Sequence, residues 1–238
     1  MRDTDRKRNS TRSQCGFSLV ELMAAMAILS IVMAVLTAGM MQIQQKSASD
    51  VNKVGMAQEA RQFMDQILRD LRQSGYPSQG MFDATTLASY PSSLASTCDT
   101  PTTVRCCTLD NNVACSLISF SSTAIQFEGD IDGSGVSEVY LQVVVPTSGS
   151  CPCTLQRGTI AKPGTTPAYY TELDNLMSQN VFTAYKYDGT AYNPATDQLS
   201  SIKNIGVTLY IRSPLPDVNV SSVTYSTTTM VSEARINN

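Results

Sequence analysis

One uninterrupted apolar stretch constrains the whole chain. Residues 22–41 form a run of twenty residues without a charge. As a helix, a run of this length matches the hydrocarbon core of a lipid bilayer. A glutamate, Glu21, lies at the start of the run. Because a carboxylate is costly to place in hydrocarbon, Glu21 is a candidate functional residue.

Charge is distributed unevenly around this stretch. Residues 1–16 contain five basic and two acidic residues, whereas the remainder contains 12 basic and 18 acidic residues. Positive charge ahead of an apolar span keeps the start of a chain in the cytoplasm, so we expect one membrane pass and an exported remainder. The alternative, a cleaved secretory signal peptide, fits poorly because no small-x-small cleavage site follows. The acidic remainder argues against nucleic-acid binding, which needs a basic surface.

Common catalytic residues are missing. The chain has no histidine, which excludes Ser-His-Asp and Cys-His catalysis and histidine-ligated zinc. It also has no phosphate-binding or dinucleotide-binding glycine motif. We therefore expect neither an enzyme nor a small-molecule substrate, with an anchored enzyme that uses other residues as the alternative.

The cysteine pattern indicates an oxidising compartment. Of seven cysteines, Cys15 precedes the apolar run, and six lie in the polar part: Cys98, Cys106, Cys107, Cys115, Cys151 and Cys153. Six cysteines in an exported domain suggest up to three disulfides, with a zinc site or free thiols as alternatives. Adjacent cysteines rarely bond to each other, so Cys106 and Cys107 should have different partners. The connectivity stays open.

The secondary-structure pattern changes after residue 77. Apolar residues recur at three- and four-residue steps over residues 51–71, which extends the apolar helix into an amphipathic one. We expect one helix over about residues 17–74, ended by Gly75 and Pro77. Alternating, β-branched runs follow at residues 116–122, 123–129, 137–146, 180–189, 202–213 and 221–232. This pattern predicts an α+β protein whose antiparallel sheet packs on the helix.

The N-terminal residues carry a family resemblance. The segment GFSLVE (residues 16–21) follows a short basic leader and opens the long apolar helix. It resembles the class III signal of type IV prepilins and pseudopilins. Residues 58–77 (QEARQFMDQILRDLRQSGYP) and 202–213 (IKNIGVTLYIRS) are similar to the minor pilins called PilW-like or PulJ-like.

The resemblance implies a processing step and a fold. A prepilin peptidase would cut between Gly16 and Phe17 and methylate the new amine of Phe17. The type IV pilin fold is implied: a long N-terminal transmembrane and amphipathic α-helix packed on an antiparallel β-sheet domain. The parts would be a cleaved leader (1–16), a transmembrane and polymerisation helix (17–41), its amphipathic continuation (42–75) and a disulfide-containing β domain (76–238). The cut removes Cys15, which leaves an even number of cysteines.

The same resemblance gives Glu21 a role. Glu21 is the fifth residue of the mature chain, one helical turn from the Phe17 amine. It would neutralise that amine in its own chain or in a neighbouring subunit during assembly. The alternative is that the Glu21 side chain reaches the membrane interface without a partner.

The function implied is structural. We expect a minor pilin of a type IV pilus that helps to initiate or cap the filament. Its partners would be other major and minor pilins, prepilin peptidase, the inner-membrane assembly platform and the membrane. It would sit in the bacterial inner membrane with a periplasmic globular domain, and then in a pilus or a periplasmic pseudopilus. The alternatives are a J-type minor pseudopilin of a type II secretion system and a DNA-uptake pseudopilus subunit.

Two further features could serve binding. In DIDGSG (residues 130–135), Asp130, Asp132 and Ser134 alternate as in a calcium loop, and Glu138 takes its ninth position. Position twelve is Leu141 instead of glutamate, so a metal-free hairpin turn is the alternative. With calcium, the domain could be a calcium-dependent adhesin on a filament; no other cofactor is expected. The Ser/Thr-rich strand 221–232 could be a sheet edge that pairs with another subunit.

Overall fold

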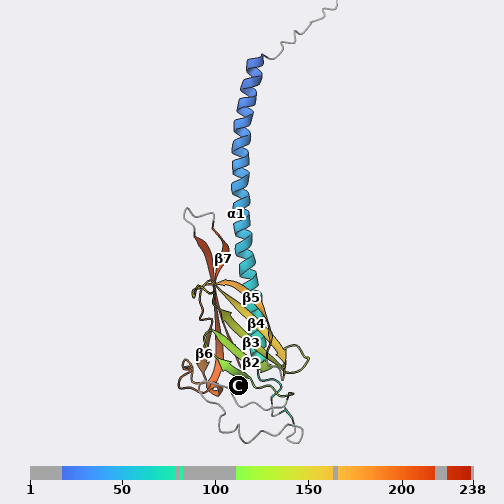
Figure 1. The fold of residues 1–238 in the computed structure, drawn as a ribbon, viewed down its shortest axis with the longest axis vertical. Helices are drawn as coiled ribbons and strands as arrows, with labels where there is room; N and C mark the ends of the chain where they lie inside the picture. The colour runs from blue at the N-terminus through green and yellow to red at the C-terminus, as the bar shows by residue number, and fades with distance from the viewer. Residues whose placement is uncertain (1–17, 79–80, 83–110, 163–165, 218–223, 237–238) are drawn as a thin grey trace, which may run out of the picture. The chain divides into compact units, whose positions relative to one another are not determined.

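The computed structural model describes residues 18–78, 81–82, 111–162, 166–217 and 224–236. Within them, the chain forms one long helix, α1 (Leu19–Gln73), and an antiparallel β-sheet (Figure 1). It divides into two compact units, Met1–Ala48 and Ser49–Asn238. The described part of the first unit is helical from residue 19 onward.

The second unit holds the sheet. Its strands are β1 (Leu117–Phe120), β2 (Ala124–Gly129), β3 (Ser137–Val144), β4 (Cys153–Ala161), β5 (Ala168–Leu176), β6 (Phe182–Lys186), β7 (Ile202–Pro216) and β8 (Tyr225–Arg235). The strand order is β1-β2-β3-β4-β5-β7-β6, and β8 pairs with β7. A 3-10 turn, η2 (Leu199–Ser201), precedes β7. Every strand pair is antiparallel, and β5 meets β7 at the single pair Leu176–Ile211.

The C-terminal part of α1 supplies one side of the core. Ala60, Phe63, Ile67 and Leu71 are at most 3% exposed and recur at the three- and four-residue spacing that places side chains on one helix face. They belong to one apolar cluster with buried side chains of the sheet, among them Phe127. The apolar stripe in the sequence therefore marks the face of α1 that packs on the sheet.

The end of α1 is fixed by its contact with β2. Gly75 follows the helix with a φ of 76°, a left-handed conformation that glycine adopts without strain. Its N–H donates to the Glu128 carbonyl at 2.9 Å. Gly129 lies against the helix end so closely that a Cβ there would be 2.6 Å from the Gln73 carbonyl oxygen. A side chain at position 129 would push β2 away from the helix.

The observed architecture confirms the predicted fold class: a long N-terminal helix with an antiparallel sheet, a layout consistent with the type IV pilin fold. Each of the six predicted runs overlaps one observed strand: β1, β2, β3, β6, β7 or β8. The sequence did not predict β4 or β5, which occupy residues 153–161 and 168–176. Most of residues 78–115, between the predicted helix and the first predicted strand, lie outside the described residues.

Candidate functional site

The start of α1 is built around Glu21. Ser18 precedes the helix, and its carbonyl accepts the Leu22 N–H at 3.1 Å. The Glu21 carboxylate turns back and accepts the Ser18 N–H, also at 3.1 Å. This contact satisfies one of the four N–H groups that a helix leaves without an intrahelical partner. Ser18 and Glu21 have the S-x-x-E spacing of a capping box, a pattern that is visible in the sequence and predicts this helix start.

The helix that follows is apolar on all sides. Its large side chains are exposed in the isolated chain: Leu22, Met23, Met26, Ile28, Leu29, Ile31, Val32, Met33, Val35, Leu36, Met40 and Met41. The two hydroxyls that interrupt the apolar run bond to their own helix, Ser30 to the Ala27 carbonyl and Thr37 to the Met33 carbonyl. No polar group of these two side chains therefore needs water. Within the described residues, α1 is the one helix long and apolar enough to cross a membrane.

The two processing residues cannot be placed beside Glu21. Gly16 and Phe17 lie outside the described residues, so the cleavage site and the pairing of Glu21 with a Phe17 amine stay predictions. The described geometry shows that the Glu21 carboxylate points back along the helix toward its N-terminal end. This is the direction from which a new amine would approach.

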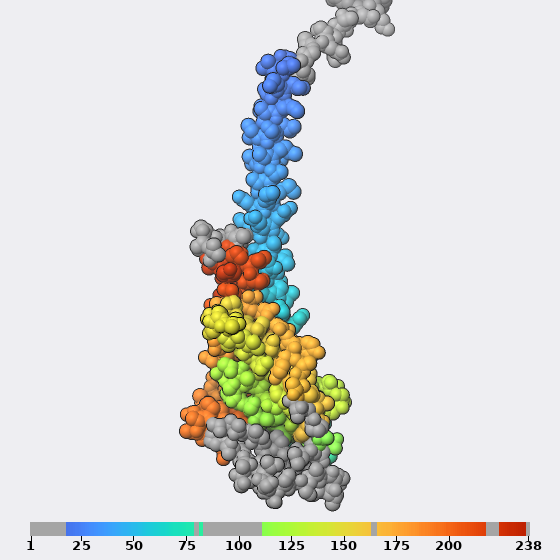
Figure 2. Space-filling model, viewed as in Figure 1, coloured from blue at the N-terminus to red at the C-terminus, as the bar shows by residue number. Residues whose placement is uncertain are grey.

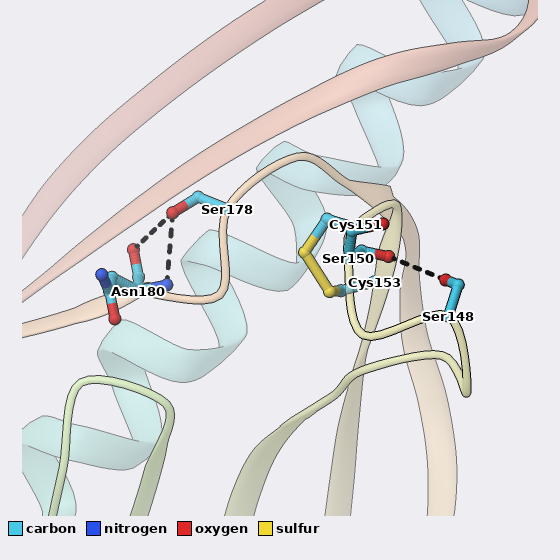
Figure 3. The surroundings of a disulfide bond; sticks show 6 residues. All are labelled: Ser148, Ser150, Cys151, Cys153, Ser178 and Asn180. Atoms are coloured by element: carbon cyan, nitrogen blue, oxygen red, sulfur yellow. Dashed lines mark hydrogen bonds between the residues drawn. A yellow bond between two sulfur atoms is a disulfide. The ribbon is translucent and has the colours of Figure 1, made fainter.

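The cysteines are only partly described. Cys151 and Cys153 are joined by a disulfide across Pro152, at the turn where β4 begins (Figure 3). Cys153 is 2% exposed and belongs to the apolar cluster, with Cys151 packed against it. Cys115 is also disulfide-bonded. Three candidates lie outside the described residues: Cys98, Cys106 and Cys107.

The candidate calcium loop uses its carboxylates to hold a turn. Asp130 accepts the Gly133 N–H at 2.8 Å, and Asp132 accepts the N–H and hydroxyl of Ser134. The hydrogen bonds from Ser134 hold the pKa of Asp132 below its usual value. Glu138 bonds instead to Gln126 and Tyr140 on the sheet. In the described chain, no three His, Cys, Asp or Glu side chains are grouped to hold a metal, and calcium binding stays a prediction.

A buried ion pair lies beside this loop. The Lys162 ammonium contacts the Glu128 carboxylate at 2.9 Å, and their side chains are only 7% and 4% exposed. The same carboxylate oxygen accepts the Cys115 N–H, and Lys162 also donates to the Val113 carbonyl. Burial raises the pKa of Glu128 although Lys162 acts in the opposite direction. The pair thus fixes the segment that carries Cys115 to the sheet.

A second ion pair joins α1 to the sheet. Arg157 on β4 contacts Asp70 on α1 at 2.8 Å, and both side chains are mostly buried. Burial is the largest effect on Asp70 and raises its pKa against the opposing effect of Arg157. No local sequence pattern indicates this pair or the pair of Glu128 and Lys162, because the partners are 87 and 34 residues apart, respectively.

One family model matches the residues around the start of α1. Residues 11–37 match the model of the prokaryotic N-terminal methylation motif. The chain is pilin-like at its N-terminus. The motif supports the interpretation of the chain as a type IV pilin-like or pseudopilin-like protein. This interpretation implies a structural subunit, pilin partners and processing by a prepilin peptidase. With the apolar helix, it is consistent with membrane anchoring and pilus assembly. Comparisons with curated proteins and with solved structures found no match.

Proposed function

We propose that this chain is a minor pilin of a type IV pilus, cut by prepilin peptidase and assembled through its N-terminal helix. The observation that carries the proposal is the methylation motif at residues 11–37, which includes the start of an apolar helix with exposed side chains. A helix with apolar residues on all sides is stable only in a membrane or among similar helices. A pilin uses both environments in turn, first the bilayer and then the filament.

In this proposal the start of the helix controls assembly. Cleavage after Gly16 frees the amine of Phe17, and methylation keeps it basic. Glu21 bonds to the Ser18 N–H in the described chain, and this capping contact lowers the cost of holding a carboxylate at the membrane edge. In the filament, Glu21 pairs with the Phe17 amine of its own chain or of a neighbour. The apolar side chains of residues 22–41 then pack against those of other subunits.

Two features of the sequence favour a minor role in the filament and a periplasmic globular domain. The resemblance of residues 58–77 and 202–213 to PilW-like proteins favours a minor pilin that helps to initiate or cap the filament. The basic leader favours a cytoplasmic N-terminus and a periplasmic globular domain. The inner-membrane assembly platform and other major and minor pilins are the partners that this role requires.

Counting surface pili in a deletion strain tests the proposal. Electron microscopy should show pili lost on deletion and restored by the wild-type gene. Unchanged pili would refute the proposed role in pilus assembly. If the deletion strain instead lost secreted proteins or DNA uptake, the chain would be a minor pseudopilin of the corresponding machine.

A further inference from the structure

Strand β8 has a long edge without a partner strand in the described chain. It spans eleven residues and is hydrogen-bonded to β7 on one side. The pairing runs without a register shift from Arg212–Thr227 to Asn204–Arg235. The Ile236 N–H donates to the Lys203 carbonyl, which fixes the alternation of the ladder. Even-numbered residues of β8 therefore direct their backbone groups to β7, and odd-numbered residues direct theirs outward. The outward set is Thr227, Thr229, Val231, Glu233 and Arg235.

This edge lacks the features that keep a sheet edge from pairing. Edge strands are normally short, bulged, interrupted by proline or protected by charge. Residues 225–232 contain no charge, proline or glycine. At about 3.3 Å per residue, β8 is roughly 36 Å long. Val231 in its centre is 72% exposed. The two charges of the strand, Glu233 and Arg235, lie together at one end.

The strand is also held firmly before any partner arrives. The Asp217 carboxylate at the far end of β7 contacts the Lys53 ammonium of α1 at 2.8 Å and accepts a hydrogen bond from Ser226. The Arg212 guanidinium stacks on the Tyr225 ring at 4.6 Å from its centroid. Figure 1 shows β7 and its partner strand rising together beside α1, and Figure 2 shows the atoms of the partner strand, in red, next to the helix. A preordered edge loses little conformational freedom when it binds.

We propose that the outward edge of β8 is an assembly interface that accepts an edge strand from the globular domain of a different pilin-like subunit. This interface rests on the proposed function, because it requires neighbouring subunits in a filament. The partner strand would be uncharged opposite residues 227–231, and its backbone would bond to the outward N–H and carbonyl groups. Such strand addition draws affinity from the main chain and specificity from alternate side chains.

A second copy of this chain fits the edge less well. Two β8 edges could pair through a twofold axis only in antiparallel orientation. That arrangement would set residues 49–73 of the two α1 helices antiparallel. Both chains must place the apolar residues that precede this segment in the same membrane. The other end strands of the described sheet, β1 and β6, have only four and five residues and match less than half of the eleven-residue β8. The partner strand therefore comes from a different subunit, as in an open filament, where one subunit contacts the next head to tail.

Photo-cross-linking of the full-length chain in its own membrane tests the proposal. A photo-reactive residue at position 229 should give an adduct with another protein that carries the N-terminal methylation motif. Val231→Pro should abolish this adduct, because it removes an outward N–H without breaking a bond to β7. Val231→Thr keeps that N–H and should retain the adduct. Met230→Pro is the matched control, because it removes a bond to β7 and should lower the amount of folded chain.

The outcomes separate this interface from the proposed function. A photo-reactive residue at position 28, in the apolar run, should cross-link to pilin-like subunits wherever the chain assembles at all. Adducts at 28 without any at 229 would overturn the β8 interface and leave the filament role intact, whereas no adduct at either position would overturn both. An adduct at 229 with a second copy or an unrelated protein would refute the partner proposed. If Val231→Pro lowers the amount of folded chain, the experiment is repeated with Thr229→Pro and the photo-reactive residue at position 231. An adduct that persists in the proline variant would refute strand pairing.

Discussion

Replacing Lys162 with methionine should destabilise the globular unit strongly at neutral pH. The substitution keeps most of the side-chain volume and removes the ammonium that contacts Glu128 at 2.9 Å. Removing one partner of a buried ion pair costs about 3–5 kcal/mol, because the other charge is left in a poorly solvated site. At roughly 2–4 °C per kcal/mol for a unit of this size, the melting temperature should fall by roughly 6–20 °C. Thermal unfolding of the full chain in detergent measures the change.

The pH dependence of this loss identifies its cause. Burial raises the pKa of Glu128 above its ordinary value of 4.5, with Glu138 adding to the increase. A raised pKa in the folded state means that stability is highest below the unfolded value and falls as pH rises through the folded value. Without Lys162, the pKa of Glu128 should rise further. Lys162→Met should therefore cost much less stability below pH 4.5, where Glu128 is protonated, than at pH 7.

Two variants control this experiment. Adding Glu128→Gln to Lys162→Met should recover part of the loss, since a neutral amide can still accept the Cys115 N–H. Lys186→Met removes a more exposed pair with Asp197, which lies at 3.3 Å, and should lower the melting temperature far less than Lys162→Met does. If Lys162→Met cost the same at both pH values and Glu128→Gln gave no recovery, the ammonium would act through packing alone, and the electrostatic argument would be refuted.

Three further predictions concern the N-terminus and the 130–138 loop. Digests of membranes should contain a peptide that begins at Phe17 and is heavier by one methyl group; mass spectrometry that finds only chains retaining residues 1–16 would contradict processing. Glu21→Gln keeps an acceptor for the Ser18 N–H but removes the charge, so it should be cut normally and fail to enter filaments, as should Glu21→Ala; filament entry of Glu21→Gln in sheared pili would show that capping suffices. If the loop binds calcium, the ion should raise the melting temperature of the wild type and not of Asp130→Asn/Asp132→Asn, whereas an equal response would place calcium elsewhere.

The sequence predicted those elements whose pattern is local. The apolar stripe of α1 could be read from its spacing, and Gly75 marked the end of the helix, which finishes at Gln73. Strand β4 escaped detection because Arg157 follows the buried Cys153 and Leu155 on the same face and interrupts the apolar alternation. Strand β5 escaped because its first four residues are exposed, and Asn175 has a φ of 59°, which is unusual in a strand. Both strands depend on contacts with distant parts of the chain.

The Asp70–Arg157 pair shows what such distant contacts add. Apolar residues recur along α1 at steps of three and four, so sliding the helix by one turn against the sheet would still bury apolar side chains. A one-turn slide moves every residue by about 5.4 Å. It would separate Asp70 from Arg157 and leave both charges mostly buried without a partner. Apolar packing therefore drives the helix onto the sheet, and we infer that the ion pair selects one register among those that the apolar pattern allows. The choice depends on two residues 87 positions apart, which no local pattern in the sequence connects.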